Sequence, residues 1–348
     1  MKHLAHPDHP FRIFFVSGFI SIASLVLVGI YMGWDKAFIA LVLMLVEITF
    51  SFENAIINAK VLSTVSKFWQ TIFITIGIFI AVFGMRLVFP IVIVMLTASL
   101  GAGQVIDLAI NRPDDYARAL HDAHASIASF GGMFLLMLCL HFFFDKHRKI
   151  RWIDIIEKPL QDMSRWWTYT AVCLTVLVVM TLLPFNPHPE EGFAAGLVGI
   201  VTYLVIHGLA ELFAHKGNPH STKKIIKTGL AGFMAFLYLE VLDASFSFDG
   251  VIGAFAVTKN VILIAIGLGI GALWVRSLTI FMVRRRVLHA YRYLEHGAHY
   301  TIGVLAIVLL LGLFVDIPEL IAGVAGIVIV GTSISSSIAA TRRGRRHG

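Results

Sequence analysis

The sequence predicts an all-α, polytopic membrane protein with about ten transmembrane helices and an inverted repeat of three-helix units. Composition is the first observation: apolar residues make up 58% of the chain and charged residues 14%, against roughly 25% charged in soluble domains. The second is that the apolar residues form blocks of about twenty, the length that a helix needs to cross a bilayer. The third is a polar motif that occurs twice. A soluble enzyme is excluded.

Ten apolar blocks are expected to form helices, numbered here in chain order. Their cores are residues 13–31, 37–58, 69–97, 126–144, 168–183, 193–213, 230–252, 261–282, 300–315 and 318–339. The N-terminal stretch MKHLAHPDHPFR is not followed by a signal-peptide cleavage pattern, so the first block is expected to remain as a span.

Basic residues gather in alternate loops and in the C-terminal tail. They are Lys60 and Lys67; Lys146, Arg148, Lys149, Arg151, Lys158 and Arg165; Lys216, Lys223, Lys224 and Lys227; Arg284, Arg285, Arg286 and Arg292; and Arg342, Arg343, Arg345 and Arg346. The intervening loops are acidic or nearly uncharged. Because basic loops favour the cytoplasm, both termini are expected there. The net charge of +7 is therefore explained by topology, and nucleic-acid binding is not expected.

Three segments recur in the same order in the two halves of the chain. ExxFSFENxI from Glu47 matches DxxFSFDGxI from Asp243, IGIFIAVFGMR (76–86) matches IGLGIGALWVR (266–276), and HDAHASI (121–127) matches HGAHYTI (296–302). The motif helices are the second and the seventh, an odd number of crossings apart, so they run in opposite directions. Inverted repeats of this kind build secondary transporters, with the substrate site near the midplane.

The repeat divides the chain into five predicted parts. They are an N-terminal segment with the first helix (1–35), repeat 1 with three helices (36–145), a cytoplasmic loop with linking helices five and six (146–228), repeat 2 with three helices (229–316), and the last helix with a basic cytoplasmic tail (317–348). Each copy of the polar motif thus opens its own three-helix unit.

Polar residues lie deep in both motif helices. Helix two carries Glu47, Ser51, Glu53, Asn54 and Asn58, and helix seven carries Glu240, Asp243, Ser247, Asp249 and Gly250. An ionisable residue at the centre of a span costs roughly 2.5–3.5 kcal/mol on insertion scales, so these residues are functional candidates.

Helical spacing separates two of these residues from the others. At about 100° per residue, Glu47, Ser51, Asn54 and Asn58 share one stripe on helix two, and Glu240, Asp243, Ser247 and Gly250 share one on helix seven. Glu53 and Asp249 fall about 120° away. We therefore expect a local break near SFEN and SFDG, where the following Asn and Gly tolerate distortion.

The donor set indicates the kind of ligand. Carboxylates, a carboxamide and hydroxyls suit hard cations such as Mg²⁺, Ca²⁺ or Mn²⁺, whereas an anion would be repelled. The alternative is that Arg86 and Arg276 neutralise these acids in two buried ion pairs that only fix helix packing. Each arginine lies nine residues after a glycine, and this shared spacing favours Glu53 and Asp249 as their partners. Two arginines cannot neutralise all five acids of the two helices, which favours a cation site with these arginines as ion-pair or gating residues.

Histidines form a second group of candidates. His121 and His124 lie at a predicted outer end, and His296 and His299 at a cytoplasmic end. Each pair could supply metal ligands or proton acceptors near a gate, or cap helices at the interface. His207 and Glu211, one turn apart on helix six, could form a proton relay or a simple hydrogen bond.

Together these residues resemble the TerC family of integral membrane proteins, within the broader LysE-like transporter group. The resemblance rests on EITFSFENAI, on LEVLDASFSFDGVIGAF and on the Gly-x8-Arg helix after each. TerC-like proteins typically show an acidic residue and then Ser-x-Asp-Asn, which here reads Glu47, Ser51, Glu53 and Asn54, with Glu in place of Asp. Their second motif typically places Glu, Asp, Ser and Asp at the positions of Glu240, Asp243, Ser247 and Asp249. The match covers roughly half the chain, and the longer chain looks like a divergent bacterial subgroup.

The resemblance implies a divalent-metal role, chiefly Mn²⁺ export or homeostasis, in the bacterial inner membrane, and a historical link with tellurite resistance. Our hypothesis is a secondary transporter, not an enzyme, that exports a divalent cation bound at midplane by helices two and seven. Mn²⁺ is favoured, Ca²⁺ or Mg²⁺ are alternatives, and proton antiport is a reasonable coupling. The rival hypotheses are a non-transporting metal-delivery partner and a metal-dependent membrane enzyme. The expected partners are the bilayer and the cation, and a homo-oligomer is compatible with the sequence.

Overall fold

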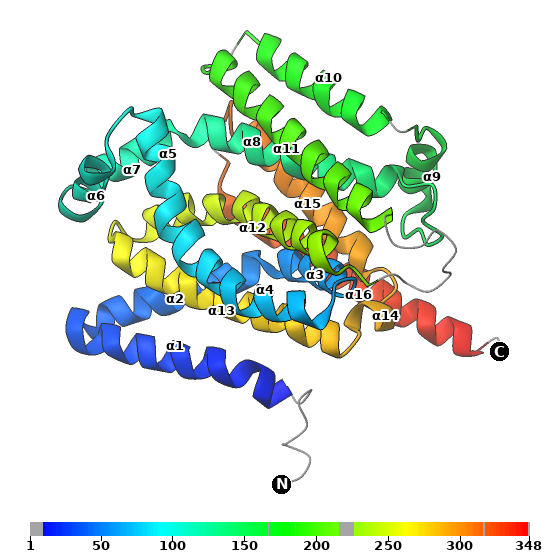
Figure 1. The fold of residues 1–348 in the computed structure, drawn as a ribbon, viewed down its shortest axis with the longest axis horizontal. Coiled ribbons are helices and arrows are strands. Elements are labelled where there is room, and N and C mark those ends of the chain that lie inside the picture. The colour runs from blue at the N-terminus through cyan, green and yellow to red at the C-terminus, as the bar shows by residue number, and fades with distance from the viewer. Residues whose placement is uncertain (1–9, 166, 185, 216–225, 316, 347–348) are drawn as a thin grey trace. The chain divides into compact units, whose positions relative to one another are not determined.

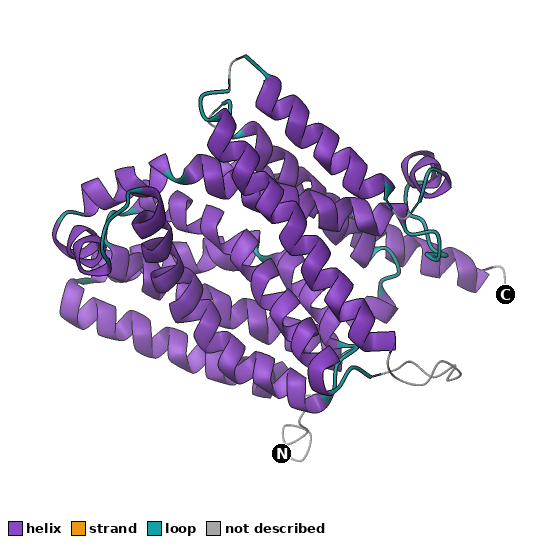
Figure 2. Ribbon diagram, turned by 45° about the horizontal axis from the view of Figure 1, so that its top comes forward, coloured by secondary structure: helices purple, strands orange, loops and turns teal. Residues whose placement is uncertain are grey.

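The computed structural model describes residues 10–165, 167–184, 186–215, 226–315 and 317–346. Over these residues the chain consists of helices and loops, and the only β contact is an isolated bridge between Val65 and Lys227 (Figures 1 and 2). This confirms the predicted all-α fold. The chain divides into two compact units, which are described separately.

Unit 1 comprises Met1–His124 and Phe213–Arg285. Its helices are α1 (Pro10–Met32), α2 (Trp34–Phe50), α3 (Phe52–Leu62), α4 (Lys67–Phe79), the π-helix η1 (Ile80–Val88), α5 (Phe89–Thr97), α6 (Ala102–Asn111), α7 (Pro113–Asp122), α12 (Gly229–Val257) and α13 (Val261–Arg284).

Unit 2 comprises Ala125–Leu212 and Arg286–Gly348. Its helices are α8 (His124–Phe144), α9 (Asp154–Asp162), α10 (Thr168–Leu182), α11 (Pro189–His215), α14 (Val287–Ala290), α15 (Leu294–Leu311) and α16 (Glu319–Arg346). The third helices of the two predicted repeats, α8 and α15, both belong to this unit, while the first two helices of each repeat belong to unit 1.

Eight described helices are long and apolar enough to span a membrane, and a bent pair of helices, α2 with α3, makes a ninth candidate. Every predicted helix core lies on a helix, which supports a multi-pass membrane protein. The predicted core at residues 168–183 forms α10, which has 15 residues and is not among these candidates. At 1.5 Å per residue it extends about 22 Å, less than the roughly 30 Å of a hydrocarbon core.

The outer face of α1 shows why the protein needs an apolar surrounding. Phe15, Phe19, Ile22 and Ile30 are each more than half exposed. In water such a surface would be unfavourable, whereas lipid tails solvate it at no cost. These exposed side chains support a lipid bilayer as the environment of the helices.

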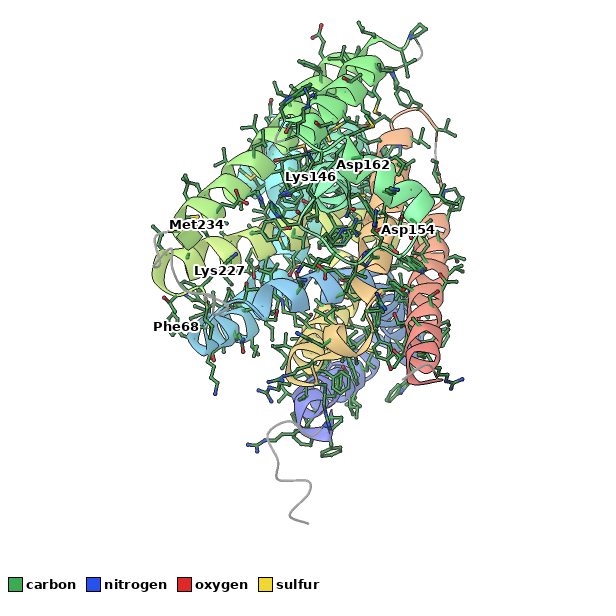
Figure 3. All side chains as sticks on the ribbon, turned by 90° about the vertical axis from the view of Figure 1, so that its right-hand side faces the viewer. Phe68, Lys146, Asp154, Asp162, Lys227 and Met234 are labelled. Atoms are coloured by element: carbon green, nitrogen blue, oxygen red, sulfur yellow. The ribbon has the colours of Figure 1, made fainter. Side chains whose placement is uncertain are left out.

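In unit 1, α13 packs along α2 at very short range. A Cβ atom on Gly267 would lie 2.7 Å from Leu43 Cβ and 3.1 Å from Ala40 O, so only glycine allows this approach. Leu43 also belongs to a buried cluster with Val251, Ala254, Ile264 and Leu268, which ties α12 to the same pair. At the far end of α3, Lys227 N donates to Thr64 O over 2.8 Å, and Figure 3 shows Lys227 near Phe68.

Helix two is broken at its motif, as predicted, and helix seven is not. The bend between α2 and α3 is 54°, at Ser51, whose φ and ψ are −103° and 17°. By contrast, α12 runs without interruption from Gly229 to Val257, so the predicted break near SFDG is wrong. Gly250 tolerates a break but does not require one, because neighbouring helices reach the polar side chains of a straight α12.

Helix three contains a feature that the sequence analysis did not predict. Its middle, Ile80–Val88, is a π-helix of nine residues, continuous with α4 before it and α5 after it. Pro90 follows near the first turn of α5 and has no N–H to donate to the helix. Wide turns of this kind often occur at functional sites, and this one carries Arg86.

In unit 2, a loop helix is held by a buried charged network. Glu157 of α9 is fully buried; it lies 2.9 Å from Arg148 Nη1 and 3.5 Å from His296 Nε2. Its Oε1 also accepts the backbone N–H groups of Trp152 and Ile153, each over 3.2 Å. The network fixes α9, which begins at Asp154, and the preceding loop, which carries Lys146, to the start of α15 (Figure 3).

Candidate functional site

The candidate site lies in unit 1, around the bend at Ser51, where polar residues of helix two are buried. Glu47, at the end of α2, is 6% exposed, and Glu53 and Asn54, in the first turn of α3, are 7% and 6% exposed. Asn58, one turn further, is 1% exposed. A straight helix would turn Glu53 about 120° away from Glu47 and Asn54. Residues 53–59 of α3 are all buried, so other parts of the protein surround this segment on every face and bury Glu53 as well.

Asp243 of α12 is the centre of the hydrogen bonding. Its Oδ1 accepts Asn54 Nδ2 over 2.8 Å and Asn58 Nδ2 over 2.9 Å. Its Oδ2 accepts Arg276 Nη2 over 2.7 Å. The same guanidinium nitrogen lies 3.2 Å from Glu240 Oε1, one turn before Asp243. Helices α3, α12 and α13 therefore meet at one carboxylate.

Glu47 forms a matching centre on the other repeat. Its Oε1 accepts Arg86 Nη2 over 2.5 Å and Ser51 Oγ over 3.0 Å. Arg86 Nη1 also donates to Ala81 O of the π-helix over 2.6 Å. In the sequence repeat Glu47 corresponds to Asp243, and Arg86 corresponds to Arg276. The two halves thus form equivalent ion pairs, as an inverted repeat requires.

The alternative predicted that Arg86 and Arg276 form buried ion pairs with these acids, and both do so; only the pairing of Arg86 with Glu53 is wrong. Arg86 pairs with Glu47 because the π-helix and the end of α2 bring these two side chains together. Among the described residues Glu53 has no ion-pair partner. Arg276 pairs with Glu240 and Asp243, and the side chain of Asp249 lies outside the described part of the structure.

A small cavity lies between the two ion pairs. Its volume is about 20 Å³, and its lining is Glu47, Ser51, Asn54, Ala81, Arg86, Asp243, Phe246, Ser247, Ala272, Val275 and Arg276. A cavity of this size holds about one water molecule. Two acceptor oxygens of this lining, Asn54 Oδ1 and Ser247 Oγ, are buried without a hydrogen-bond partner among the described residues, as is the nearby Asn58 Oδ1.

The donor chemistry fits a hard cation, although the present geometry does not form a closed metal site. All the donors are oxygens from carboxylates, amides and hydroxyls, the set preferred by Mg²⁺, Ca²⁺ and Mn²⁺. Within the described residues no three His, Cys, Asp or Glu side chains converge so as to hold an ion. The two arginines occupy the carboxylates instead. Three described carboxylates, those of Glu47, Glu240 and Asp243, contact the two guanidiniums, so the acids outnumber the arginines that pair with them.

Glycines allow the helices to approach around these ion pairs. A Cβ atom on Gly271 of α13 would lie 2.5 Å from Glu47 Cβ and 3.0 Å from Met44 O. On α4, a Cβ atom on Gly77 would press on Arg276 Nη1 and lie 2.7 Å from Glu240 Oε1. In each repeat, a glycine of the second helix thus packs closely against charged residues of the other repeat.

We expect Gly271→Ala to lower the free energy of unfolding by about 1–3 kcal/mol, because the added methyl overlaps atoms close to the backbone of α2. Equilibrium unfolding in detergent micelles measures this change. Gly18→Ala on α1 is the matched control, since nothing lies within 4 Å of the added Cβ, and it should be neutral or stabilising by up to about 1 kcal/mol. Equal effects of the two variants would contradict the close packing at Glu47.

The predicted histidine pairs have different surroundings. His121 and His124 stack with their ring centroids 6.3 Å apart at the turn between α7 and α8. In unit 2, His296 Nε2 lies 2.9 Å from Ile150 O. His299 stacks on Phe142 at 3.7 Å. These two rings are packed within unit 2, in contacts that need no ligand.

His207 and Glu211 face each other, with 3.4 Å between Nε2 and Oε1. The sequence analysis missed their neighbour His141, whose ring centroid is 4.3 Å from that of His207. It also missed the buried Glu157. No sequence signal marks His141, a lone histidine in an apolar block, whereas Glu157 sits in a basic loop where a buried acid is not expected.

The helices and the buried polar centre define the class to which the chain belongs: an all-α, multi-pass membrane protein with a charged site inside its helices. Over residues 52–344 it matches the model of the family described as "Protein of unknown function (DUF475)", and it belongs to that family. The match begins at the first residue of α3 and includes Asp243, Arg86 and Arg276. No curated protein and no solved structure matches the chain.

Proposed function

We propose that this protein is a secondary transporter that exports a divalent cation, with Mn²⁺ as the favoured substrate. One observation carries the proposal: two repeat-equivalent pairs, Glu47–Arg86 and Asp243–Arg276, enclose a small cavity inside membrane helices. Carboxylate, amide and hydroxyl oxygens form part of its lining. Three oxygens at or near it, Asn54 Oδ1, Asn58 Oδ1 and Ser247 Oγ, have no hydrogen-bond partner among the described residues, and oxygen donors of this kind match the preference of a divalent cation.

The structure corresponds to a closed form in which the arginines take the place of the cation. The Arg276 guanidinium neutralises Asp243 and Glu240, and the Arg86 guanidinium neutralises Glu47. A cavity of about 20 Å³ has no room for a hydrated ion. A cation therefore binds only when the helices separate and the guanidiniums move away, and the bend at Ser51 and the wide turn η1 are the places where such a movement costs least.

The resemblance to TerC-like proteins suggests which ion is transported and in which direction it crosses the membrane. On that basis we assign export from the cytoplasm of a bacterial cell, both termini on the cytoplasmic side, and exchange against protons, which compete with metals for carboxylates. Metal-dependent catalysis is not proposed, because the cavity has no space for an organic substrate beside an ion. A metal-delivery partner would bind the same ion without moving it across the membrane.

Binding is tested first by thermal unfolding of the purified protein in detergent with MnCl₂, CaCl₂ or MgCl₂. A ligand at about 100 times its Kd contributes roughly 2.7 kcal/mol to the native state. We expect Mn²⁺ to raise the unfolding midpoint by about 4 °C or more, with a smaller rise for Mg²⁺. The proposal is contradicted if none of the three divalent cations raises the midpoint beyond the effect of NaCl at equal ionic strength.

A further inference from the structure

A second polar site lies in unit 2, where α8, α10 and α11 end near one another. A pocket of about 590 Å³ opens there. Its lining is His141, Phe144, Asp145, Lys146, His147, Ser164, Arg165, Trp167, Tyr169, His207 and Glu211. The volume is within the range of small-molecule sites. The 145–167 segment that forms one wall is the strongly basic loop predicted to be cytoplasmic.

Four side chains form a continuous row of titratable groups from the pocket mouth to the interior. Glu211, 63% exposed, lies 3.4 Å from His207 Nε2. The His207 ring meets the His141 ring edge to face, with centroids 4.3 Å apart. His141 Nδ1 is 2.6 Å from the hydroxyl of Tyr203, which is 1% exposed. The Tyr169 ring stacks on the His141 ring, with centroids 4.9 Å apart. The His141 ring is therefore held between Tyr169, Tyr203 and His207.

The surroundings of the two imidazoles favour a proton over other ligands. The charged or titratable groups that face them are Glu211 and Tyr203 of α11, Tyr169 of α10, Asp145, Lys146 and His147 after α8, and Arg165 before α10. Two carboxylates against two fixed cations leave no net charge to attract an anion. A metal ion would need three converging donors, and the described residues offer no such group. A proton needs only the row of neighbouring N and O atoms.

We propose that His141, His207 and Glu211 form a proton-uptake site on the side of the 145–167 loop. One proton passes from pocket water to the Glu211 carboxylate and on to His207 Nε2, beside the edge-to-face ring of His141. Only O–H and N–H bonds form and break, and the site gains one positive charge. Two rings 4.3 Å apart repel each other when both are charged, so the pair binds one proton over the pH range in which isolated imidazoles would bind two. Tyr203 is a positioning residue that orients His141.

The role of this site in transport, as the source of the exchanged proton, rests on the proposed function. Proton uptake by the site does not depend on that function. Uptake is measured by NMR of the full-length protein with ¹³C-labelled histidine, titrated from pH 5 to 9. His207→Gln and His141→Gln assign the two signals. We expect removal of either ring to shift the titration midpoint of the other by about one pH unit, because coupled groups titrate as a pair. Glu211→Gln, an exposed change, should shift the His207 midpoint without affecting folding.

His188→Gln is the matched control, because His188 also faces a glutamate, with 3.8 Å between its Nδ1 and Glu191 Oε2. Its side chain is half exposed, and among the described residues no second imidazole packs on it. It should leave both midpoints unchanged. The proposal is overturned if neither ring titrates, if each midpoint moves by less than half a unit when the other ring is removed, or if micromolar Mn²⁺ selectively broadens both signals, which would make this a metal site.

Ion flux separates the two proposals. If wild-type proteoliposomes move Mn²⁺ and His207→Gln lowers the flux driven by a pH gradient at least about tenfold, the site supplies the exchanged proton. If His207→Gln retains the wild-type response to the gradient, that role is wrong although transport stands. If the wild type moves no divalent cation, the proposed function fails, and the NMR titration alone decides whether the pocket takes up a proton.

Discussion

Asp243→Ala is expected to abolish Mn²⁺-dependent stabilisation and to lower the free energy of unfolding by about 3–5 kcal/mol. Asp243 accepts hydrogen bonds from Asn54, Asn58 and Arg276. Its loss removes that acceptor from two buried amides and leaves Glu240 as the one described carboxylate that contacts Arg276. The effect should be the largest of any described acid in unit 1, since no other described carboxylate there joins three helices. Equilibrium unfolding in detergent, with and without MnCl₂, measures both quantities.

Asp114→Ala is the control for removal of an ion-paired aspartate. Asp114 pairs with Lys259 on the surface, where both side chains are more than 60% exposed, and such pairs contribute about 0–1 kcal/mol. This variant should keep the full response to Mn²⁺. If Asp243→Ala unfolds like Asp114→Ala, or if its midpoint still rises with Mn²⁺, Asp243 is not the centre of the site.

Arg276→Met is expected to make the stability of the protein depend on a divalent cation. Without the guanidinium, Glu240 and Asp243 face each other unpaired inside the helices, and breaking a buried pair costs about 3–5 kcal/mol. The methionine fills part of the space above the Phe73 ring, where the guanidinium carbon of Arg276 lies 4.0 Å from the ring centroid. A bound Mn²⁺ then supplies the missing positive charge. The unfolding midpoint should be low in EDTA and should rise with Mn²⁺ by at least twice the wild-type amount.

Arg148→Met tests whether any buried arginine would behave in this way. Arg148 pairs with the buried Glu157 in unit 2, outside the small cavity between the two ion pairs, so its loss should destabilise the protein without creating a dependence on Mn²⁺. Rescue of both variants by Mn²⁺, or of neither, would show that the arginine at Asp243 does not take the place of a cation.

The positions of the apolar helices and the burial of the polar stripe on helix two could be predicted from the sequence. Apolar blocks bounded by charge follow directly from bilayer thickness, although eight or nine helices of the described chain, and not ten, are long and apolar enough to span a membrane. Glu47, Asn54 and Asn58 of the predicted stripe are buried. The 120° offset of Glu53 also predicted the break at Ser51, but residues 53–59 are all buried, so the bend is not what buries Glu53.

The pairing of charges could not be predicted, because it depends on how separate helices approach. The repeat spacing suggested that Arg86 meets Glu53, yet the π-helix places Arg86 against Glu47. The angular offset of Asp249 predicted a break in helix seven as well, but α12 continues without interruption. Side chains of α3 and α13 reach its acids from outside the helix. The edge-to-face pair of His141 and His207 likewise joins helices from distant parts of the sequence, and only three-dimensional packing reveals it.

The most direct test of the account is Mn²⁺ entry into sealed proteoliposomes, followed by quenching of an enclosed metal-sensitive dye. We predict flux with the wild type and with Asp114→Asn that rises when the liposome interior is acidic, and a loss of at least about 100-fold with Asp243→Asn, which keeps the shape of the side chain but removes its charge. Flux by Asp243→Asn equal to the wild type, or none by the wild type under any pH gradient while the protein remains folded, would contradict a divalent-cation transporter built around Asp243.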